Sequence, residues 1–197
     1  LGIDAGGTYT DSVLLDDDTD SILDSNKALT TYPDPLDGIK NSIDGLDQEK
    51  LKKVKIVSVS TTLSTNTILE GTGFPVGLFL IGNYDLKEKL PTPHYVKVAG
   101  GHTYNGAEKE PLDEEGVRDF AVKIKDKVAA FAISSFFSIR NPDHEIRAKQ
   151  IIREATGLPV VCAHELSQDL GAFERATTAF FNAQLLPITE RFMSTVE

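Results

Sequence analysis

The sequence predicts an α/β fold that opens with an antiparallel meander of three strands. Residues 1–31 contain three strand-like runs separated by short turns, at residues 1–3, 9–15 and 22–31. Further along, apolar runs of strand length alternate with segments whose apolar residues recur at helical spacing. These observations predict a mixed sheet flanked by helices, followed by a second α/β subdomain.

A helix and a fourth strand follow the meander. After Pro35, apolar residues recur at helical spacing up to Leu46, which predicts a helix. Residues 54–60 then read as a strand. We expect this strand to be central in the sheet and parallel to the first strand. The strand–helix–strand connection then requires a right-handed crossover.

Strands and helices alternate in the second half of the chain. The expected strands are residues 75–81, 95–99, 128–137 and 158–163. The expected helices are residues 111–127, 142–156 and 170–186, the last interrupted or ended by Pro187. We expect about residues 1–81 and 158–197 to form a core, with about 82–157 as an inserted α/β subdomain.

Length and composition narrow the class of protein. The 197 residues suffice for one substantial core or two small α/β units. Thirty acidic against twenty basic residues give a formal net charge of −10, which disfavours nucleic acid or a membrane surface as partner. The apolar runs are too short to span a bilayer and the N-terminus lacks a secretory pattern. We therefore expect a cytoplasmic protein.

The first candidate site lies in the turn between the first two strands. A tight two-residue turn at Gly6 and Gly7 needs positive φ. A turn alone does not explain Asp4 at its mouth, or the hydroxyls of Thr8 and Thr10. Glycines let backbone amides approach an anion, hydroxyls add donors, and a carboxylate can hold a hydrated cation. On these residues, a phosphate-binding hairpin and a plain turn both remain open.

The second candidate site is a hydroxyl-rich stretch directly after the fourth strand. Residues 60–66 read STTLSTN, with five hydroxyls and one amide. A helix cap needs only one hydroxyl. Open α/β sheets bind ligands at the carboxyl ends of their parallel strands, so we expect this stretch to face a ligand.

Other chemically active residues have simpler explanations. His102 lies in a glycine-flanked loop, where a structural or solvated role is expected. His144 and Glu145 occupy adjacent helical positions that point about 100° apart, so helix capping and surface charge explain them better than a metal pair. Cys162 lies in an apolar run and is expected to be a buried strand residue rather than a nucleophile.

Three landmarks occur in a fixed order along the chain. Residues 2–11 read GIDAGGTYTD and residues 60–66 read STTLSTN. The third landmark combines NPDHE at 141–145, HE at 164–165 and FERATTAFFNA at 173–183. Over essentially its whole length the chain resembles the N-terminal region of the hydantoinase A / 5-oxoprolinase / acetone carboxylase family. It departs from the family at Tyr9, which is usually Phe, and at Ser60, which is usually Gly.

The resemblance implies an actin-like ATPase fold, which is related to ribonuclease H. In this fold two lobes close on ATP, and this chain corresponds to the N-terminal lobe. By that analogy Asp4 holds Mg²⁺ through water. The residues implied for nucleotide binding are Gly6, Gly7, Thr8, Tyr9, Thr10 and Asp11. Thr61, Thr62 and Asn66 join Asp4 as candidate catalytic residues on the facing wall of the cleft. Arg175, Thr178 and Asn182 share a helix face and serve either this cleft or the core and hinge.

The resemblance also implies an activity for the full-length protein. Family members use ATP to activate an unreactive carbonyl, in hydantoinases and oxoprolinases the amide oxygen of a five-membered ring. The expectation is ATP-dependent hydrolysis of a cyclic amide, with a hydantoinase B-type subunit as partner. The second phosphate loop belongs to the family's later half, so this stretch alone should bind ATP poorly or not at all.

Three alternatives stay open. A ketone carboxylase subunit or a small-molecule kinase of the same fold would use the same opening hairpin, although the landmarks after residue 140 argue against the kinase. A non-catalytic assembly or regulatory lobe would bind a partner chain without chemistry.

Overall fold

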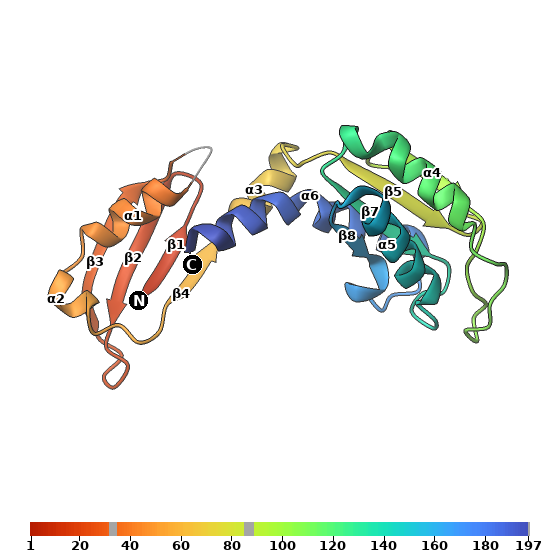
Figure 1. Cartoon of the computed structure of the whole chain (residues 1–197). Helices are drawn as coiled ribbons and strands as arrows, with labels where there is room; N and C mark the ends of the chain where they lie inside the picture. Colours follow the sequence, from red (N-terminus) through yellow and green to blue (C-terminus); the bar gives the residue numbers. More distant parts are fainter. Residues whose placement is uncertain (32–34, 85–88, 197) are drawn as a thin grey trace. The chain divides into compact units, whose positions relative to one another are not determined.

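The computed structural model describes residues 1–31, 35–84 and 89–196 (Figure 1). The chain divides into two compact units. Unit 1 comprises Leu1–Thr72 and Ile188–Glu197, and unit 2 comprises Gly73–Pro187. No helix in the described ranges has the length and apolar character needed to cross a bilayer.

Unit 1 is built on a mixed four-stranded sheet. Its strands are β1 (Gly2–Ala5), β2 (Tyr9–Leu15), β3 (Ile22–Leu29) and β4 (Ser58–Thr61), in the order β3-β2-β1-β4. Strands β1 to β3 pair antiparallel and β4 pairs parallel to β1. The expected meander and the parallel fourth strand are confirmed.

The expected central position of the fourth strand is wrong. Among the described residues β4 is an edge strand. It is also short, and Ser58 and Ser60 are exposed while Val59 and Thr61 are half-buried. A central parallel strand is covered on both faces and is apolar throughout, whereas this strand alternates with hydroxyl residues.

One face of this sheet packs on α1 (Leu36–Asp44). Thr10, Ser12 and Leu14 of β2 are buried on this inner face, and Ser12 Oγ lies 2.6 Å from Ser42 Oγ of α1. The other side chains of β2, from Tyr9 onward, are exposed or half-buried on the outer face. Alternation along β2 therefore separates an inner, helix-facing set of side chains from an outer, accessible set.

Two short helices flank β4. Helix α2 (Gln48–Leu51) is capped by the Asp47 carboxylate, which accepts the amides of Glu49 and Lys50. Helix α3 (Leu63–Glu70) follows β4 directly and ends at Gly71, whose φ of +65° lies in the left-handed region. Glycine adopts this conformation without the Cβ penalty, which explains the stop.

Unit 2 is built on a wholly parallel sheet. Its strands are β5 (Val76–Ile81), β6 (Tyr95–Val98), β7 (Ala130–Ser135) and β8 (Val160–Cys162), in the order β6-β5-β7-β8. Every residue of β5 and β7 is buried. Their continuous apolar runs are typical of parallel strands covered on both faces, and the four expected strands are confirmed.

Helices cover both faces of this sheet. Helix α4 (Glu114–Ile124), with the 3₁₀ turn η1 (Lys125–Lys127), and α5 (Asp143–Thr156) pack on one face around Phe79, Phe131 and Ile151. The first half of α6 (Ala172–Val196) packs on the other face, where Ala176, Ala179 and Phe180 meet Leu78 and Leu80. A 3₁₀ turn, η2 (Ala163–Glu165), follows β8.

Of the two outcomes expected at Pro187, an interruption or an end of the last helix, the end is wrong, because α6 continues to Val196. Proline removes one backbone N–H and crowds the carbonyl of the preceding turn, which kinks a helix without always ending it. The division between the two units falls at this proline.

The two strands that flank the expected insertion, β5 before it and β8 after it, lie in the same sheet of the structure. This sheet also contains β6 and β7. How the longer protein divides into a core and an inserted subdomain stays a prediction.

Helix α5 offers a matched test of the core of unit 2. Ile151 is fully buried, while Ile146 on the same helix is 51% exposed. Ile151→Ala should lower the free energy of unfolding by about 2–5 kcal/mol, because it leaves a cavity between α5 and the sheet. Ile146→Ala should change it by less than about 1 kcal/mol. Urea denaturation measures both, and equal losses would contradict the packing described.

Candidate functional site

The hairpin between β1 and β2 is held by close backbone contacts. The Gly6 N–H donates to the Tyr9 carbonyl at 3.0 Å. Thr30, just after β3, donates its amide to the Thr8 carbonyl at 3.0 Å and its hydroxyl to the Gly6 carbonyl at 2.8 Å. The tip is therefore fixed both by its own strands and by the end of the third strand.

The expected positive φ at Gly6 and Gly7 is wrong, because neither residue lies in the left-handed region. Gly6 is needed for a different reason. A Cβ at Gly6 would lie 2.9 Å from the Tyr9 carbonyl oxygen, closer than real Cβ contacts allow. The glycine thus permits close backbone approach rather than an unusual turn.

Asp4 is exposed at the outer face of the sheet, one residue before the end of β1. In the parallel register it lies beside Ser60 of β4, whose hydroxyl donates to Asp4 Oδ1 at 2.7 Å. In the described part of the chain, Asp4 Oδ2 has no hydrogen-bond partner. One carboxylate oxygen is thus anchored while the other stays available to a ligand.

A second acid lies directly opposite Asp4. Asp11 of β2 faces Asp4 across the antiparallel pair, and its carboxylate binds Lys27 of β3 at 2.6 Å. The Lys27 ammonium also lies 5.1 Å from the centre of the Tyr9 ring. Like charges facing each other across strands repel, so Lys27 offsets the charge of Asp11 and leaves Asp4 as the unpaired acid of the two.

Two of the candidate hydroxyls point to the inner side of the sheet. Thr10 is fully buried and its Oγ1 lies 3.1 Å from Thr30 Oγ1. Thr61 donates its hydroxyl to the Ala5 carbonyl at 2.9 Å. These side chains tie strands together, and any contact of Thr10 with a nucleotide stays a prediction.

Thr62 and Asn66 lie in the first turn of α3. Thr62 is the N-cap, its carbonyl accepts the Asn66 amide at 3.0 Å, and Asn66 Nδ2 lies 3.5 Å from Thr62 Oγ1. Because β1 and β4 are parallel, their carboxyl ends meet, with Ala5 beside Thr61. The structure therefore brings the glycine hairpin, Asp4 and the hydroxyl-rich stretch to one edge of one sheet.

This edge suits an anion accompanied by a hydrated cation. The first amides of α3 offer N–H donors, because helix N-termini leave these groups without intrahelical partners and favour negative charge. The available oxygen of Asp4 and the Ser60 hydroxyl fit the water shell of a hard divalent cation such as Mg²⁺. The residues present thus fit a metal–phosphate group.

Sequence reasoning missed one contact and one residue at this edge. Ser60 belongs to the hydroxyl-rich stretch expected to face a ligand, but only the parallel register shows that it is the partner of Asp4. Lys27 was not singled out. Strand alternation places it on the same face as Asp11, which is the signal that could have identified it.

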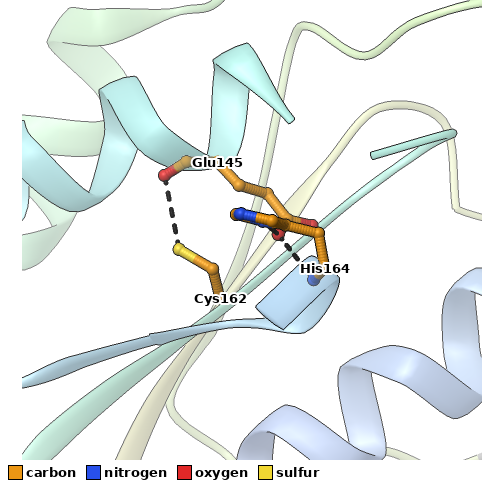
Figure 2. Close-up of side chains that lie close together, drawn as sticks. All are labelled: Glu145, Cys162 and His164. Atoms are coloured by element: carbon orange, nitrogen blue, oxygen red, sulfur yellow. Dashed lines mark hydrogen bonds and ion pairs between the residues drawn. The ribbon is translucent and has the colours of Figure 1, made fainter. Parts of the chain in front are cut away.

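A second polar cluster lies inside unit 2, where Figure 2 shows Glu145, Cys162 and His164 close together. The expectation of surface charge at His144 and Glu145 is wrong, because both side chains are buried. Helical spacing could not show that the first turn of α5 packs over the carboxyl ends of β7 and β8.

The Glu145 carboxylate accepts two backbone N–H donors and contacts a histidine nitrogen. Oε1 accepts the Ser135 amide at 2.7 Å, and Oε2 accepts the His164 amide at 3.0 Å and lies 2.6 Å from His164 Nδ1. Glu145 thereby joins the end of β7 to the turn after β8. Such a buried carboxylate is stable only because its charge is met by donors.

The donor set of this cluster is that of a zinc site, since one oxygen, one sulfur and one nitrogen lie within 4.8 Å of one another. The hydrogen bonds of the cluster argue against a metal site. The two Glu145 oxygens already accept two backbone N–H groups and contact His164 Nδ1, and Cys162 Sγ donates to the Glu145 carbonyl at 3.6 Å. Burial and the nearby Glu145 raise the pKa of the Cys162 thiol, so the thiolate that zinc needs is disfavoured. Cys162 is the expected buried strand residue.

The rings of two further histidines, His102 and His144, lie close together in unit 2. His144 Nδ1 accepts the Gly101 amide at 2.8 Å, so in the neutral ring the proton lies on Nε2, 2.9 Å from Glu108 Oε1. The His102 ring centre lies 4.3 Å from that of His144. Burial, and then the charge of His144, lower the pKa of His102. The buried position favours the structural role expected for His102 over the solvated one.

Arg175 is another buried polar residue near these strand ends. Its Nη1 donates to the Asp169 carbonyl at 2.6 Å and its Nη2 to the Ser135 carbonyl at 3.0 Å. Thr178 and Asn182, by contrast, are exposed on α6. Of the two roles left open for these residues, Arg175 has the core-facing one.

Two glycines provide a matched test of the hairpin. A Cβ at Gly6 would meet the Tyr9 carbonyl at 2.9 Å, whereas a Cβ at Gly2 has nothing within 4 Å. Gly6→Ala should destabilise unit 1 by about 1–3 kcal/mol, because the backbone must shift. Gly2→Ala should leave stability unchanged or raise it slightly, since it restricts only the unfolded chain. Urea denaturation checks both, and a neutral Gly6→Ala would rule out the close approach.

Stability should fall as the pH is lowered, in part because of His102. The lowered pKa of His102 means that between this pKa and the usual value of 6.5 the unfolded chain binds a proton that the folded chain does not. Nearby Glu108 and Asp143 oppose the shift without reversing it. His102→Gln should therefore reduce the loss of stability below about pH 6.5, by at most about 1.4 kcal/mol per pH unit. Denaturation at pH 5.5 and 7.5 measures it, and an unchanged slope would exclude His102.

Comparison with known proteins assigns the chain to a family. The family model of the hydantoinase/oxoprolinase N-terminal region matches residues 1–156. The chain is 30% identical to the caprolactamase subunit alpha of Pseudomonas jessenii over 228 aligned positions, which cover 100% of this chain and 32% of that protein. It is 31% identical to the acetophenone carboxylase gamma subunit of Aromatoleum aromaticum, covering 94% and 31% of the two chains.

Solved structures show the same fold. A nucleotide-free acetone carboxylase structure superposes with a TM-score of 0.77 at 22% identity, over 99% of this chain and 34% of that one. The ATP-dependent caprolactamase of Pseudomonas jessenii gives a TM-score of 0.75 at 27% identity, over 100% and 33%. The chain thus spans about one third of the length of the relatives it matches. Its α/β fold is consistent with an actin-like ATPase-type lobe. The chain belongs to the hydantoinase/oxoprolinase family and carries the N-terminal region of that family.

Proposed function

We propose that the protein containing this chain hydrolyses a cyclic amide of the hydantoin or 5-oxoproline type at the expense of ATP. In this proposal the edge formed by the glycine hairpin, Asp4 and α3 binds the phosphates and their cation. The observation that carries it is the Asp4 carboxylate, anchored by Ser60 at 2.7 Å beside a hairpin whose glycine permits close backbone approach. The ATP-dependent caprolactamase, a relative that by its name acts on a cyclic amide, supports it.

The chemistry proceeds in balanced steps. The amide oxygen bonds to the γ-phosphorus of ATP and ADP leaves, which makes the ring carbon electrophilic. Water then bonds to that carbon, the ring carbon–nitrogen bond breaks, and the nitrogen takes a proton. A second water hydrolyses the remaining acyl phosphate to carboxylate and phosphate.

The residues of unit 1 contribute position and charge to these steps. Mg²⁺, when bound, neutralises phosphate charge, and Asp4 orients its water shell. Gly6, Gly7 and Thr8 form the tip of the hairpin, and Thr62 and Asn66 lie at the start of α3. Holding the phosphates in one geometry is the main catalytic task in phosphoryl transfer.

A ketone carboxylase subunit is the second candidate, favoured by the 31% identity to the acetophenone carboxylase gamma subunit. The two activities share ATP-dependent activation of a carbonyl and differ in whether water or a carboxyl donor attacks. The relatives are named as alpha and gamma subunits, which supports a partner subunit of the hydantoinase B type.

An assay on the full-length protein with its partner subunit separates these proposals. ATP is supplied with hydantoin, 5-oxoproline or caprolactam, or with a ketone and bicarbonate, and both phosphate and organic product are measured. Ring opening without a stable phosphorylated product supports the hydrolase. Carboxylated ketone supports the carboxylase, a stable phosphorylated metabolite supports a kinase, and the absence of any turnover supports an assembly lobe.

Asp4→Asn in that full-length protein should lower turnover by about 10–100-fold, the usual effect of losing a group that orients a metal's bound water. Raising the Mg²⁺ concentration should restore part of the activity. Asp18→Asn is the matched control, because Asp18 is an exposed acid in the turn after β2. Unchanged turnover in Asp4→Asn would remove the hairpin from the mechanism.

A further inference from the structure

The carboxyl end of the parallel sheet of unit 2 holds a histidine backed by a buried carboxylate. His164 lies in η2, directly after β8, and Glu145 reaches it from the first turn of α5 (Figure 2). Ligands of open parallel sheets bind at this end of the strands. The position is therefore one where a reactive side chain can meet a substrate.

The hydrogen bonds of Glu145 determine where the His164 proton lies. Two backbone N–H groups, those of Ser135 and His164, donate to the two carboxylate oxygens, which therefore act as acceptors. At 2.6 Å from Oε2, His164 Nδ1 must then be the donor. The neutral ring consequently carries its proton on Nδ1 and a lone pair on Nε2.

That lone pair remains available. The His164 side chain is 19% exposed, and in the described part of the chain Nε2 has no hydrogen-bond partner. Among the other titratable groups around it, Glu165 is paired with Lys149 at 2.6 Å and the Cys162 thiol stays protonated. A carboxylate that fixes the tautomer and orientation of a partly accessible imidazole is the arrangement of a general base.

We propose that Glu145 and His164 form a proton-transfer pair whose base, His164 Nε2, takes the proton of water as the water oxygen bonds to the activated carbonyl carbon. The proton is then returned to the ring nitrogen when the carbon–nitrogen bond breaks, so the imidazole ends as it began. Glu145 acts through His164 and is a positioning residue. The identity of the nucleophile rests on the proposed hydrolase function, whereas the pair itself rests on the geometry alone.

The pair is tested first without activity, on the whole chain. Nitrogen-15 NMR of labelled histidine should show the Nδ1–H tautomer for His164. Diethyl pyrocarbonate, followed by peptide mass spectrometry, should modify His164 readily in the native chain. Glu145→Gln should change the tautomer and slow the modification several-fold. The matched control, Glu165→Gln, removes a neighbouring carboxylate and should change neither.

Three results on the chain would overturn the pair. The first is an Nε2–H tautomer in the native protein, and the second is an unreactive His164. The third is binding of Zn²⁺ with loss of the Nδ1 proton. Binding of Co²⁺ would then give a thiolate charge-transfer band, and Cys162→Ser would abolish that band. In that case the cluster is a metal site.

Kinetics of the full-length protein with its partner subunit test the role of the pair. His164→Gln should lower kcat for ring opening by about 10²–10⁴-fold, the usual contribution of general acid–base catalysis, and remove one limb of its pH profile. KM for ATP should not change. A native kcat and pH profile in His164→Gln would overturn the role. If the wild-type protein opens no ring, the hydrolase proposal and the water-activating role fail together, while the tautomer and reactivity still decide whether the pair exists.

Discussion

The candidate nucleotide site depends on the pairing of β1 with two strands, one antiparallel and one parallel to it. The antiparallel pairing with β2 forms the glycine hairpin, and the parallel pairing with β4 carries the start of α3 to the same edge. The register of these pairs sets the side chains as well, since it places Asp4 between Asp11 and Ser60. A shift by one residue would turn Asp4 to the inner face and remove the site.

Local patterns predicted most of the fold but not the contacts that give the sites their chemistry. The meander and the apolar strands β5 and β7 follow from alternation and turn chemistry, which act over a few residues. The bond from Ser60 to Asp4 joins residues 56 apart, and only the register of a parallel pair determines it. The role expected for Gly6 is wrong for a different reason: the constraint is local, but it is the space beside the Tyr9 carbonyl rather than a positive φ.

Glu145 shows the same limit for a buried charge. Its position in the first turn of a helix is typical of an exposed acid that favours the helix dipole, and the sequence supported that interpretation. Packing of α5 on the ends of β7 and β8 instead encloses the carboxylate among three N–H donors. The cost of burying the charge is offset by those bonds, which also leave the neighbouring imidazole with a defined tautomer.

The chain enters and leaves unit 2 at adjacent points. Unit 2 is one uninterrupted segment, Gly73–Pro187, and near its two ends the Phe74 amide donates to the Gln184 carbonyl at 3.4 Å. Unit 1, in contrast, is assembled from two separate segments, and the second of these, residues 188–197, is synthesised only after all of unit 2. Unit 2 can therefore complete its core during synthesis before that segment is made.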